Sequence, residues 1–151
     1  MVKTIKNIQG VSLIEFLVSF VILVLVTGGI LFSYIRCMEF IELSKNMSIA
    51  VQAAQSRMDQ IKATNYSLVS SSFNGISFAI PNLNGIGVTY IDNSVADLLD
   101  VNVVICWRNK NDRLYGEDGN LNGVLDVGED LNVNLRLDSP VELHTRIFQR
   151  L

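Results

Sequence analysis

Side-chain oxygens alternate along a short stretch near the C-terminal end of the chain, residues 118–129. They occur at positions 1, 3, 5, 9 and 12 of the stretch, on Asp118, Asn120, Asn122, Asp126 and Glu129. Gly123 stands at position 6, where a sharp turn is needed, and the main-chain carbonyl of Val124 is available at position 7. Calcium takes roughly six to eight oxygen ligands, and a calcium loop supplies them at this spacing. The sequence therefore predicts a calcium site at 118–129.

The residues around this stretch read as β-strands rather than as a pair of helices. The stretch resembles the isolated EF-hand-like calcium loops of bacterial exported proteins, not an EF-hand domain. The alternative is an ordinary acidic turn, because Asp, Asn and Gly are also the preferred turn residues. We expect calcium to order this long hairpin insertion, whose carboxylates would otherwise repel one another.

A second, weaker register follows directly. Leu135 stands where the first register has its glycine, so no separate site is predicted there. Asp130 is expected to assist the first site. The oxygen-bearing residues of this second register are Asp130, Asn132, Asn134 and Asp138.

Near the other end of the chain, residues 16–35 form an apolar run without any charged side chain. As a helix, such a run spans about 30 Å, the thickness of the hydrocarbon core of a bilayer. Lys3 and Lys6 precede it, so the positive-inside rule places the N-terminus in the cytoplasm. A secretory signal peptide is the alternative, but the run is long for one and lacks a clear cleavage site.

Glu15 lies at the edge of this run. A carboxylate inside a bilayer costs a few kcal/mol, which suggests that it has a partner there. The alternative is an interfacial position among the lipid headgroups.

The composition agrees with one membrane span and one modest domain. The chain has 151 residues, of which 49% are hydrophobic and 18% charged, with a net charge of −3 and a mean hydropathy of +0.33. This balance excludes general disorder. Because 12 Lys and Arg face 15 Asp and Glu, no basic surface for nucleic acid is expected.

The residues from Gly10 to Glu15 read GVSLIE, between a short basic leader and the apolar run. This order resembles the processing site of type IV prepilins and pseudopilins. The resemblance implies that a prepilin peptidase cuts after Gly10 and that Val11 becomes an N-methylated terminus. It also implies that Glu15 pairs with the terminal amine of a neighbouring subunit in a filament. Two buried opposite charges stabilise each other only in the correct register.

The chain departs from major pilins at two positions. Val11 stands where they usually carry Phe, and Phe32 stands where they commonly carry a helix-kinking Pro. Gly28 and Gly29 form the only weak point of the helix nearby. A minor pilin or a pseudopilin fits these departures better than a major subunit.

One helix is expected over residues 11–63, because no proline interrupts them and a stripe of apolar or small residues continues beyond Arg36. The stripe consists of Phe40, Leu43, Met47, Ala50, Ala54, Met58 and Ile61. After Asn65 the period changes to two, which predicts strands at 76–80, 85–91, 101–108 and 141–148. Trp107 is expected in the core. The predicted fold class is α+β, a pilin-like long N-terminal helix packed on an antiparallel sheet of about four strands.

Few other residues suggest chemistry. His144 is the only histidine, and its strand alternation predicts that it faces solvent with Glu142 and Arg146. Cys37 and Cys106 are too few for a disulfide framework, and we do not expect them to pair. Since no constellation indicates a reaction, an enzyme is not expected.

The sequence thus predicts a leader at 1–10, a transmembrane assembly helix at 11–35, its amphipathic half at 36–65 and a β-sheet head at 66–151. The expected function is a structural subunit of a type IV pilus-like filament, a minor pilin, with a type II secretion pseudopilin as the alternative. A signal-anchored periplasmic calcium-binding module that does not polymerise is the alternative from another class.

The expected partners are other pilin subunits, prepilin peptidase and the inner-membrane pilus assembly or secretion machinery. The subunit would begin in the bacterial inner membrane, with its head in the periplasm, and would end in a pilus at the cell surface.

Overall fold

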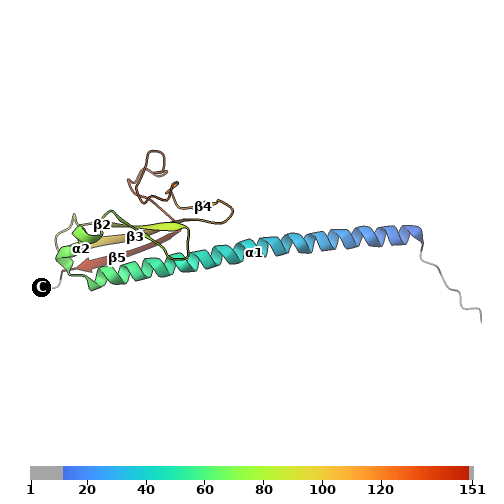
Figure 1. Ribbon diagram of the computed structural model, residues 1–151, viewed down its shortest axis with the longest axis horizontal. Helices are drawn as coiled ribbons and strands as arrows, with labels where there is room; N and C mark the ends of the chain where they lie inside the picture. The colour runs from blue at the N-terminus through green and yellow to red at the C-terminus, as the bar shows by residue number, and fades with distance from the viewer. Residues whose placement is uncertain (1–11, 150–151) are drawn as a thin grey trace, which may run out of the picture. The chain divides into compact units, whose positions relative to one another are not determined.

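The computed structural model describes residues 12–149 of the chain. A long helix, α1 (Leu13–Ala63), precedes a short helix, α2 (Tyr66–Phe73), and five strands (Figure 1). The chain is therefore an α+β protein with one long N-terminal helix and an antiparallel sheet, as predicted. It divides into two compact units, Met1–Ile41 and Glu42–Leu151. The strands are β1 (Ile76–Ala79), β2 (Gly85–Asp92), β3 (Leu98–Arg108), β4 (Leu114–Tyr115) and β5 (Val141–Phe148).

In the first unit, the described residues 12–41 contain the beginning of α1, and all of them are exposed. By its length and composition, α1 is able to cross a membrane. Ser19 and Thr27, two of the four hydroxyl-bearing residues in the apolar run, each donate a hydroxyl hydrogen bond of 2.8 Å to the carbonyl four residues earlier. The helix continues without a break through Gly28, Gly29 and Phe32.

In the second unit, α1 packs on the sheet through small and apolar side chains. The predicted stripe is confirmed over its C-terminal part and wrong at Phe40 and Met47, which are 65% and 42% exposed. Phe40 precedes Leu43, the first residue of α1 that packs against the core of this unit, and Met47 is not among the side chains packed there. The fully or nearly fully buried members of the stripe are Ala50, Ala54, Met58 and Ile61.

The central strand of the sheet is β3. It pairs with β2 along one edge, and along the other with β5 and, at its end, with β4. Trp107 is fully buried in the core shared with α1 and stacks on Tyr115, with ring centroids 5.2 Å apart. This position confirms the prediction that Trp107 belongs to the core.

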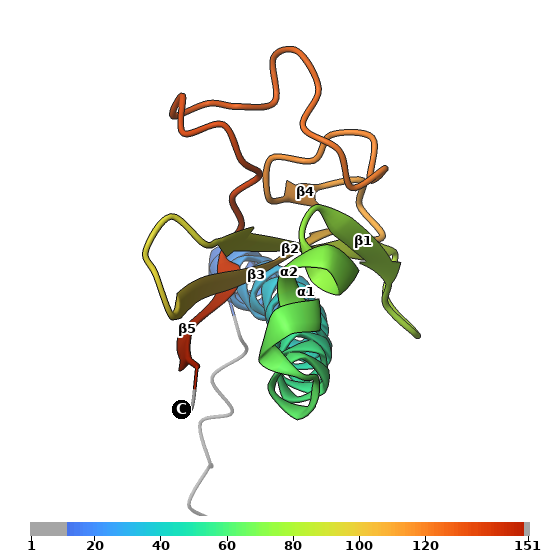
Figure 2. The ribbon, with the colours of Figure 1, turned by 90° about the vertical axis from the view of Figure 1, so that its left-hand side faces the viewer.

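The opposite face of the sheet is covered by the segment between β4 and β5. Figure 2 shows this orange segment on one side of β2 and β3, with α1 on the other. Leu137 is fully buried, and its backbone N–H donates to the Tyr90 hydroxyl at 3.1 Å. Gly116, at a φ of +111°, lies against Cys106, where an added Cβ would come within 2.4 Å of the sulfur. The head is therefore three layers thick, whereas the sequence predicted two.

Candidate functional site

The predicted calcium loop lies in the segment that covers the sheet, and its first acidic residue is its most buried one. Asp118 is fully buried, and its two carboxylate oxygens accept backbone N–H groups from Asn122 at 3.2 Å and Gly123 at 2.7 Å. The side-chain oxygen of Asn120 also accepts the N–H of Asn122, at 2.9 Å. These bonds fold residues 118–123 into a tight turn around the Asp118 carboxylate.

The other predicted ligands close the same turn. One carboxylate oxygen of Asp126 accepts both the Asn120 and the Asn122 side-chain amides, at 2.7 and 2.8 Å. Glu129 accepts the backbone N–H of Gly119 at 2.7 Å and that of Asp126 at 3.0 Å. The structure thus joins all five predicted side-chain ligands through one set of hydrogen bonds.

Val124 differs from those five residues. Its side chain is 57% exposed, and its backbone N–H donates to the Asn122 side chain at 2.7 Å. Its predicted contribution is a main-chain carbonyl, so the exposed side chain is consistent with the prediction.

Gly123 is needed at its position for two reasons. Its φ of +77° lies in the left-handed region, and an added Cβ would come within 2.4 Å of the Ser77 Cβ and 3.2 Å of Ile86 Cδ1. The turn is therefore seated directly on β1 and β2. The sequence predicted the turn at Gly123 but not this contact with the sheet.

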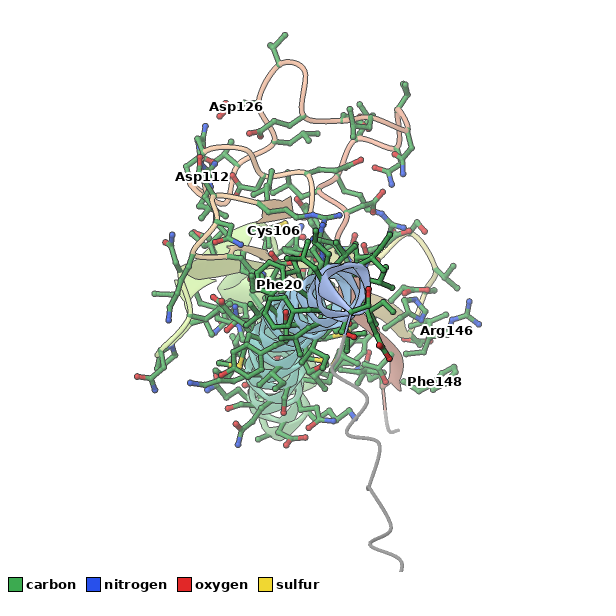
Figure 3. All side chains as sticks on the ribbon, turned by 90° about the vertical axis from the view of Figure 1, so that its right-hand side faces the viewer. Phe20, Cys106, Asp112, Asp126, Arg146 and Phe148 are labelled. Carbon is green, nitrogen blue, oxygen red and sulfur yellow. The ribbon has the colours of Figure 1, made fainter. Side chains whose placement is uncertain are left out.

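The charge of Asp118 has no cationic partner in the part of the chain that the structure describes. Within residues 12–149, no Lys, Arg or His side chain forms an ion pair with Asp118, Asp126 or Glu129. Arg108 approaches the loop, but its guanidinium pairs with Asp112 at 2.8 Å and donates to the carbonyl of Gly119 at 2.5 Å. Figure 3 shows Asp112 and Asp126 on the loop side of the sheet, away from Arg146 and Phe148 on β5.

A second turn follows, and it repeats the hydrogen bonds of the first turn at an interval of twelve residues. The carboxylate of Asp130 accepts the N–H groups of Asn134 at 3.0 Å and Leu135 at 2.9 Å, as Asp118 does with Asn122 and Gly123. Asp138 accepts the side-chain amides of Asn132 and Asn134, as Asp126 does in the first turn. Leu135 has a φ of +63°, so it adopts the conformation that glycine supplies in the first turn.

Glu117 closes the second turn, and the sequence analysis did not identify it. It accepts the N–H groups of Leu131 at 3.3 Å and Asp138 at 3.1 Å. Glu129 makes the two corresponding bonds in the first turn, to residues twelve positions earlier in each case. The twelve-residue interval between Glu117 and Glu129 was the available signal in the sequence.

The predicted ligand set has three kinds of oxygen: carboxylate, side-chain amide and main-chain carbonyl. Among the described residues, no three His, Cys, Asp or Glu side chains are grouped as a metal site would require. The predicted set contains three carboxylates, Asp118, Asp126 and Glu129, and in this conformation these three are not grouped in that way. Its other ligands are two amides and a main-chain carbonyl. Amide oxygen and nitrogen exchange places by rotation of the side chain. Rotation at Asn120 and Asn122 would direct oxygens toward Asp126.

The N-terminal residues of the prediction are only partly described. Gly10 and Val11 lie outside the described residues. Glu15 lies in the first turn of α1, is exposed, and donates its backbone N–H to the carbonyl of Ser12 at 2.9 Å. Its side chain is thus available at the surface of the helix.

The residues set aside by the sequence analysis have structural roles. His144 is exposed on β5, as predicted, and forms an ion pair with Asp100, which also contacts Arg146 at 3.3 Å. Cys37 is exposed and Cys106 buried, and both are free thiols. Burial raises the pKa of the Cys106 thiol to about 11.

No protein-family model, curated protein or solved structure matches the chain.

Proposed function

We propose that the chain is a structural subunit of a type IV pilus-like filament, a minor pilin cut after Gly10 by a prepilin peptidase. The observation that carries the proposal is the order of a basic leader, the GVSLIE motif and an apolar helix, ahead of a separately cored α+β unit. The apolar side chains of residues 13–35 are at least half exposed, so they need a bilayer or neighbouring helices around them. A filament subunit meets both environments, first in the membrane and then in the assembly.

Glu15 would determine how one subunit docks on the next. Its carboxylate stands among exposed apolar side chains, including Leu13, Ile14 and Phe16. When these side chains are covered by lipid or by other helices, the carboxylate loses water and needs a cation. In a filament, the amine of a processed Val11 on a neighbouring subunit would supply that positive charge.

Calcium would stabilise the head at residues 118–129. The support for this is the buried Asp118 carboxylate, which has no cationic partner within residues 12–149, and the hydrogen-bonded turn that it shares with Asn120, Asn122, Asp126 and Glu129. Bound calcium would neutralise these carboxylates and hold the segment against the sheet. The residues present fit a hard cation, because every expected ligand atom is an oxygen.

Mass spectrometry of the mature N-terminus tests the proposal. The expected result is a chain that begins at a methylated Val11. In the same cells, Glu15→Gln is expected to give processed subunits that assemble poorly into filaments. Glu39→Gln is the matched control, because Glu39 lies on the same helix beyond the apolar run and pairs with Arg36.

A chain that still begins at Met1, or that is cut near Gly29, would overturn the proposal. If Glu15→Gln leaves filament incorporation unchanged, the alternative of an anchored calcium-binding module is favoured. Detection of the processed chain with secretion components instead of pili would favour the pseudopilin.

A further inference from the structure

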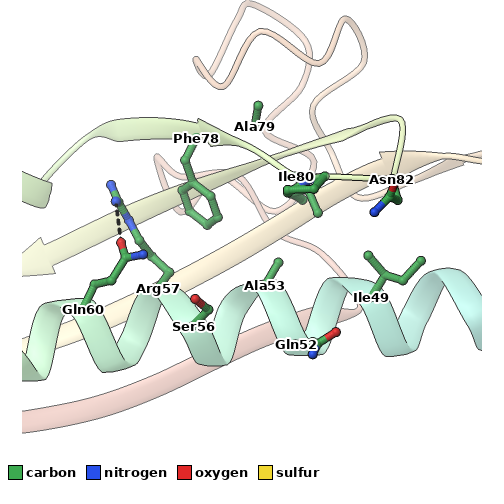
Figure 4. A pocket seen from close by; sticks show the side chains of 11 residues that line it. Ile49, Gln52, Ala53, Ser56, Arg57, Gln60, Phe78, Ala79, Ile80 and Asn82 are labelled. Atoms are coloured by element: carbon green, nitrogen blue, oxygen red, sulfur yellow. Dashed lines mark hydrogen bonds between the residues drawn. The ribbon is translucent and has the colours of Figure 1, made fainter.

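An open groove of about 600 Å³ lies between α1 and β1 in the second unit. Figure 4 shows helix residues on one side and the end of β1 with the following turn on the other. The groove is apolar around Ile49, Ala53 and Ile80, and its one charged lining residue is Arg57. Neither the calcium loop nor the apolar run contributes a residue to it.

One wall of the groove is a free strand edge. β1 pairs only with β2, and along its other edge no strand within residues 12–149 bonds to it. Ser77 and Ala79 are exposed, and β1 carries no charged residue that would block another strand. An unprotected edge of this kind offers backbone N–H and C=O groups to an extended polypeptide.

The other wall holds Arg57, which has no acidic partner within residues 12–149. The Arg57 guanidinium carbon lies 4.6 Å from the centroid of the Phe73 ring and 4.8 Å from that of Phe78. Its polar contacts are both neutral, to Gln60 Oε1 at 3.3 Å and to the Thr89 hydroxyl at 3.5 Å. No carboxylate of the described residues pairs with it.

The position of this guanidinium is well defined. The Phe78 ring lies across Gly87 of β2, where an added Cβ would come within 2.3 Å of the ring. The Phe78 and Phe73 rings each form a cation–π contact with the Arg57 guanidinium. Burial lowers the pKa of Arg57 from its ordinary value, which reflects the cost of removing the charge from water. A carboxylate at this point would offset that cost and form a charge-assisted, two-pronged contact.

We propose that this groove binds an extended segment of a neighbouring polypeptide, which pairs with β1 as an added strand and places a carboxylate side chain against Arg57. Charge complementarity identifies the acidic residue, and the unpaired edge of β1 identifies the extended conformation. A helical partner or a lipid headgroup would use Arg57 but would leave the β1 edge without hydrogen bonds. The inference does not depend on whether the chain polymerises.

Three synthetic peptides test the proposal with the full chain in detergent micelles. The first is a seven-residue peptide of alternating threonine and valine with a central glutamate. The second replaces the glutamate by glutamine, and the third keeps the glutamate but carries N-methyl groups along its backbone. We expect the first peptide to shift the amide resonances of Ile76 to Ala79 and to protect them from hydrogen exchange.

We expect the glutamine peptide to bind about ten-fold more weakly or worse, since a hydrogen bond to a charged group contributes about 1.5–3 kcal/mol. The N-methylated peptide is expected to lose binding because it lacks the strand donors. Arg57→Gln should remove the preference for glutamate, and Arg57→Lys should retain only part of it. Lys62→Gln is the matched control on the same helix, and the preference should persist in it.

The resonances of the β2 and β3 amides report whether each variant remains folded. Equal binding of the glutamate and glutamine peptides would overturn the proposal, as would unchanged binding of the N-methylated peptide. The absence of any shift in β1 at millimolar peptide would also overturn it. If anionic lipid vesicles displace the peptide and shift the same β1 resonances, the groove would be assigned to a lipid surface instead.

Discussion

At the scale of single residues, Asp118 is the basis for the prediction that a cation stabilises the second unit. Its carboxylate is fully buried and is stabilised in the described chain only by backbone amides. A buried charge without a counter-charge destabilises the folded state. A ligand that binds only the folded state shifts the folding equilibrium toward that state. We therefore expect calcium to raise the thermal unfolding midpoint of the full chain in micelles by several degrees. Addition of a chelator should reverse the rise, and an unchanged midpoint would contradict the calcium site.

Glu129→Gln removes one negative charge from the predicted ligand set. It keeps one of the two backbone hydrogen bonds, because glutamine has a single side-chain oxygen where Glu129 uses two. We expect calcium affinity, measured by titration calorimetry, to fall at least about ten-fold, which corresponds to about 1.4 kcal/mol. Asp112→Asn is the control, because Asp112 is an exposed acid of the preceding turn that pairs with Arg108. An equal loss in both variants would show that only the net charge of the region matters.

Most residues of this site were predictable because a calcium loop repeats fixed residue types at fixed intervals. The pattern identified Asp118, Asn122 and Glu129, and the structure joins them in one turn. It did not identify Glu117, because this residue precedes the loop and closes the following turn instead. The burial of Asp118 was not predictable either, since it depends on the sheet beneath the loop.

At the scale of elements, the packing of α1 against the sheet depends on small side chains. Ala54 is fully buried within the core of the second unit, and Ala63 is exposed at the end of the same helix. Ala54→Leu is expected to lower the free energy of unfolding by about 1–3 kcal/mol, because the added atoms must displace packed neighbours. Ala63→Leu makes the same change in solvent and should be nearly neutral. Urea unfolding of the full chain in micelles measures both, and equal effects would contradict this packing.

The elements that the sequence predicted are those whose side chains follow a period. Alternating residues located four of the five strands, although β3 begins at Leu98, three residues before the predicted position. α2 was missed because eight residues with three consecutive serines carry no clear period. It forms because Asn65 caps its N-terminus and Val69 is buried against the core. β4 has two residues, and its position depends on pairing with the end of β3.

The covering layer over the second face of the sheet could not be predicted from periodicity. Leu137 and Cys106 are buried there, but the segment that contains Leu137 has turns instead of a strand or helix pattern. The apolar stretch of β3 was interpreted as having one face in the core. Both faces are buried, which explains why eight of the eleven residues of β3 are apolar.

At the scale of the whole molecule, the two units differ in where their apolar surface lies. Residues 13–35 expose theirs, whereas the second unit buries its own in a core around Trp107. The mean hydropathy of +0.33 therefore averages an apolar helix and an ordinary acidic head. The proposed function requires that α1 cross a membrane with the second unit on the periplasmic side, and this orientation is a prediction that can be tested.

The two cysteines allow this orientation to be measured. Cys37 is exposed just after the apolar run, whereas Cys106 is buried and burial raises the pKa of its thiol to about 11. Only Cys37 should therefore react near neutral pH, because the thiolate is the reactive form. We expect a membrane-impermeant maleimide to label the chain from the periplasmic side of intact inner membranes. Cys37→Ser should abolish this labelling until the protein is denatured, and Cys106→Ser should leave it unchanged. Labelling of Cys37 only after the membrane is disrupted would place the head in the cytoplasm. This outcome would contradict the proposed filament subunit, whose head must lie in the periplasm before assembly.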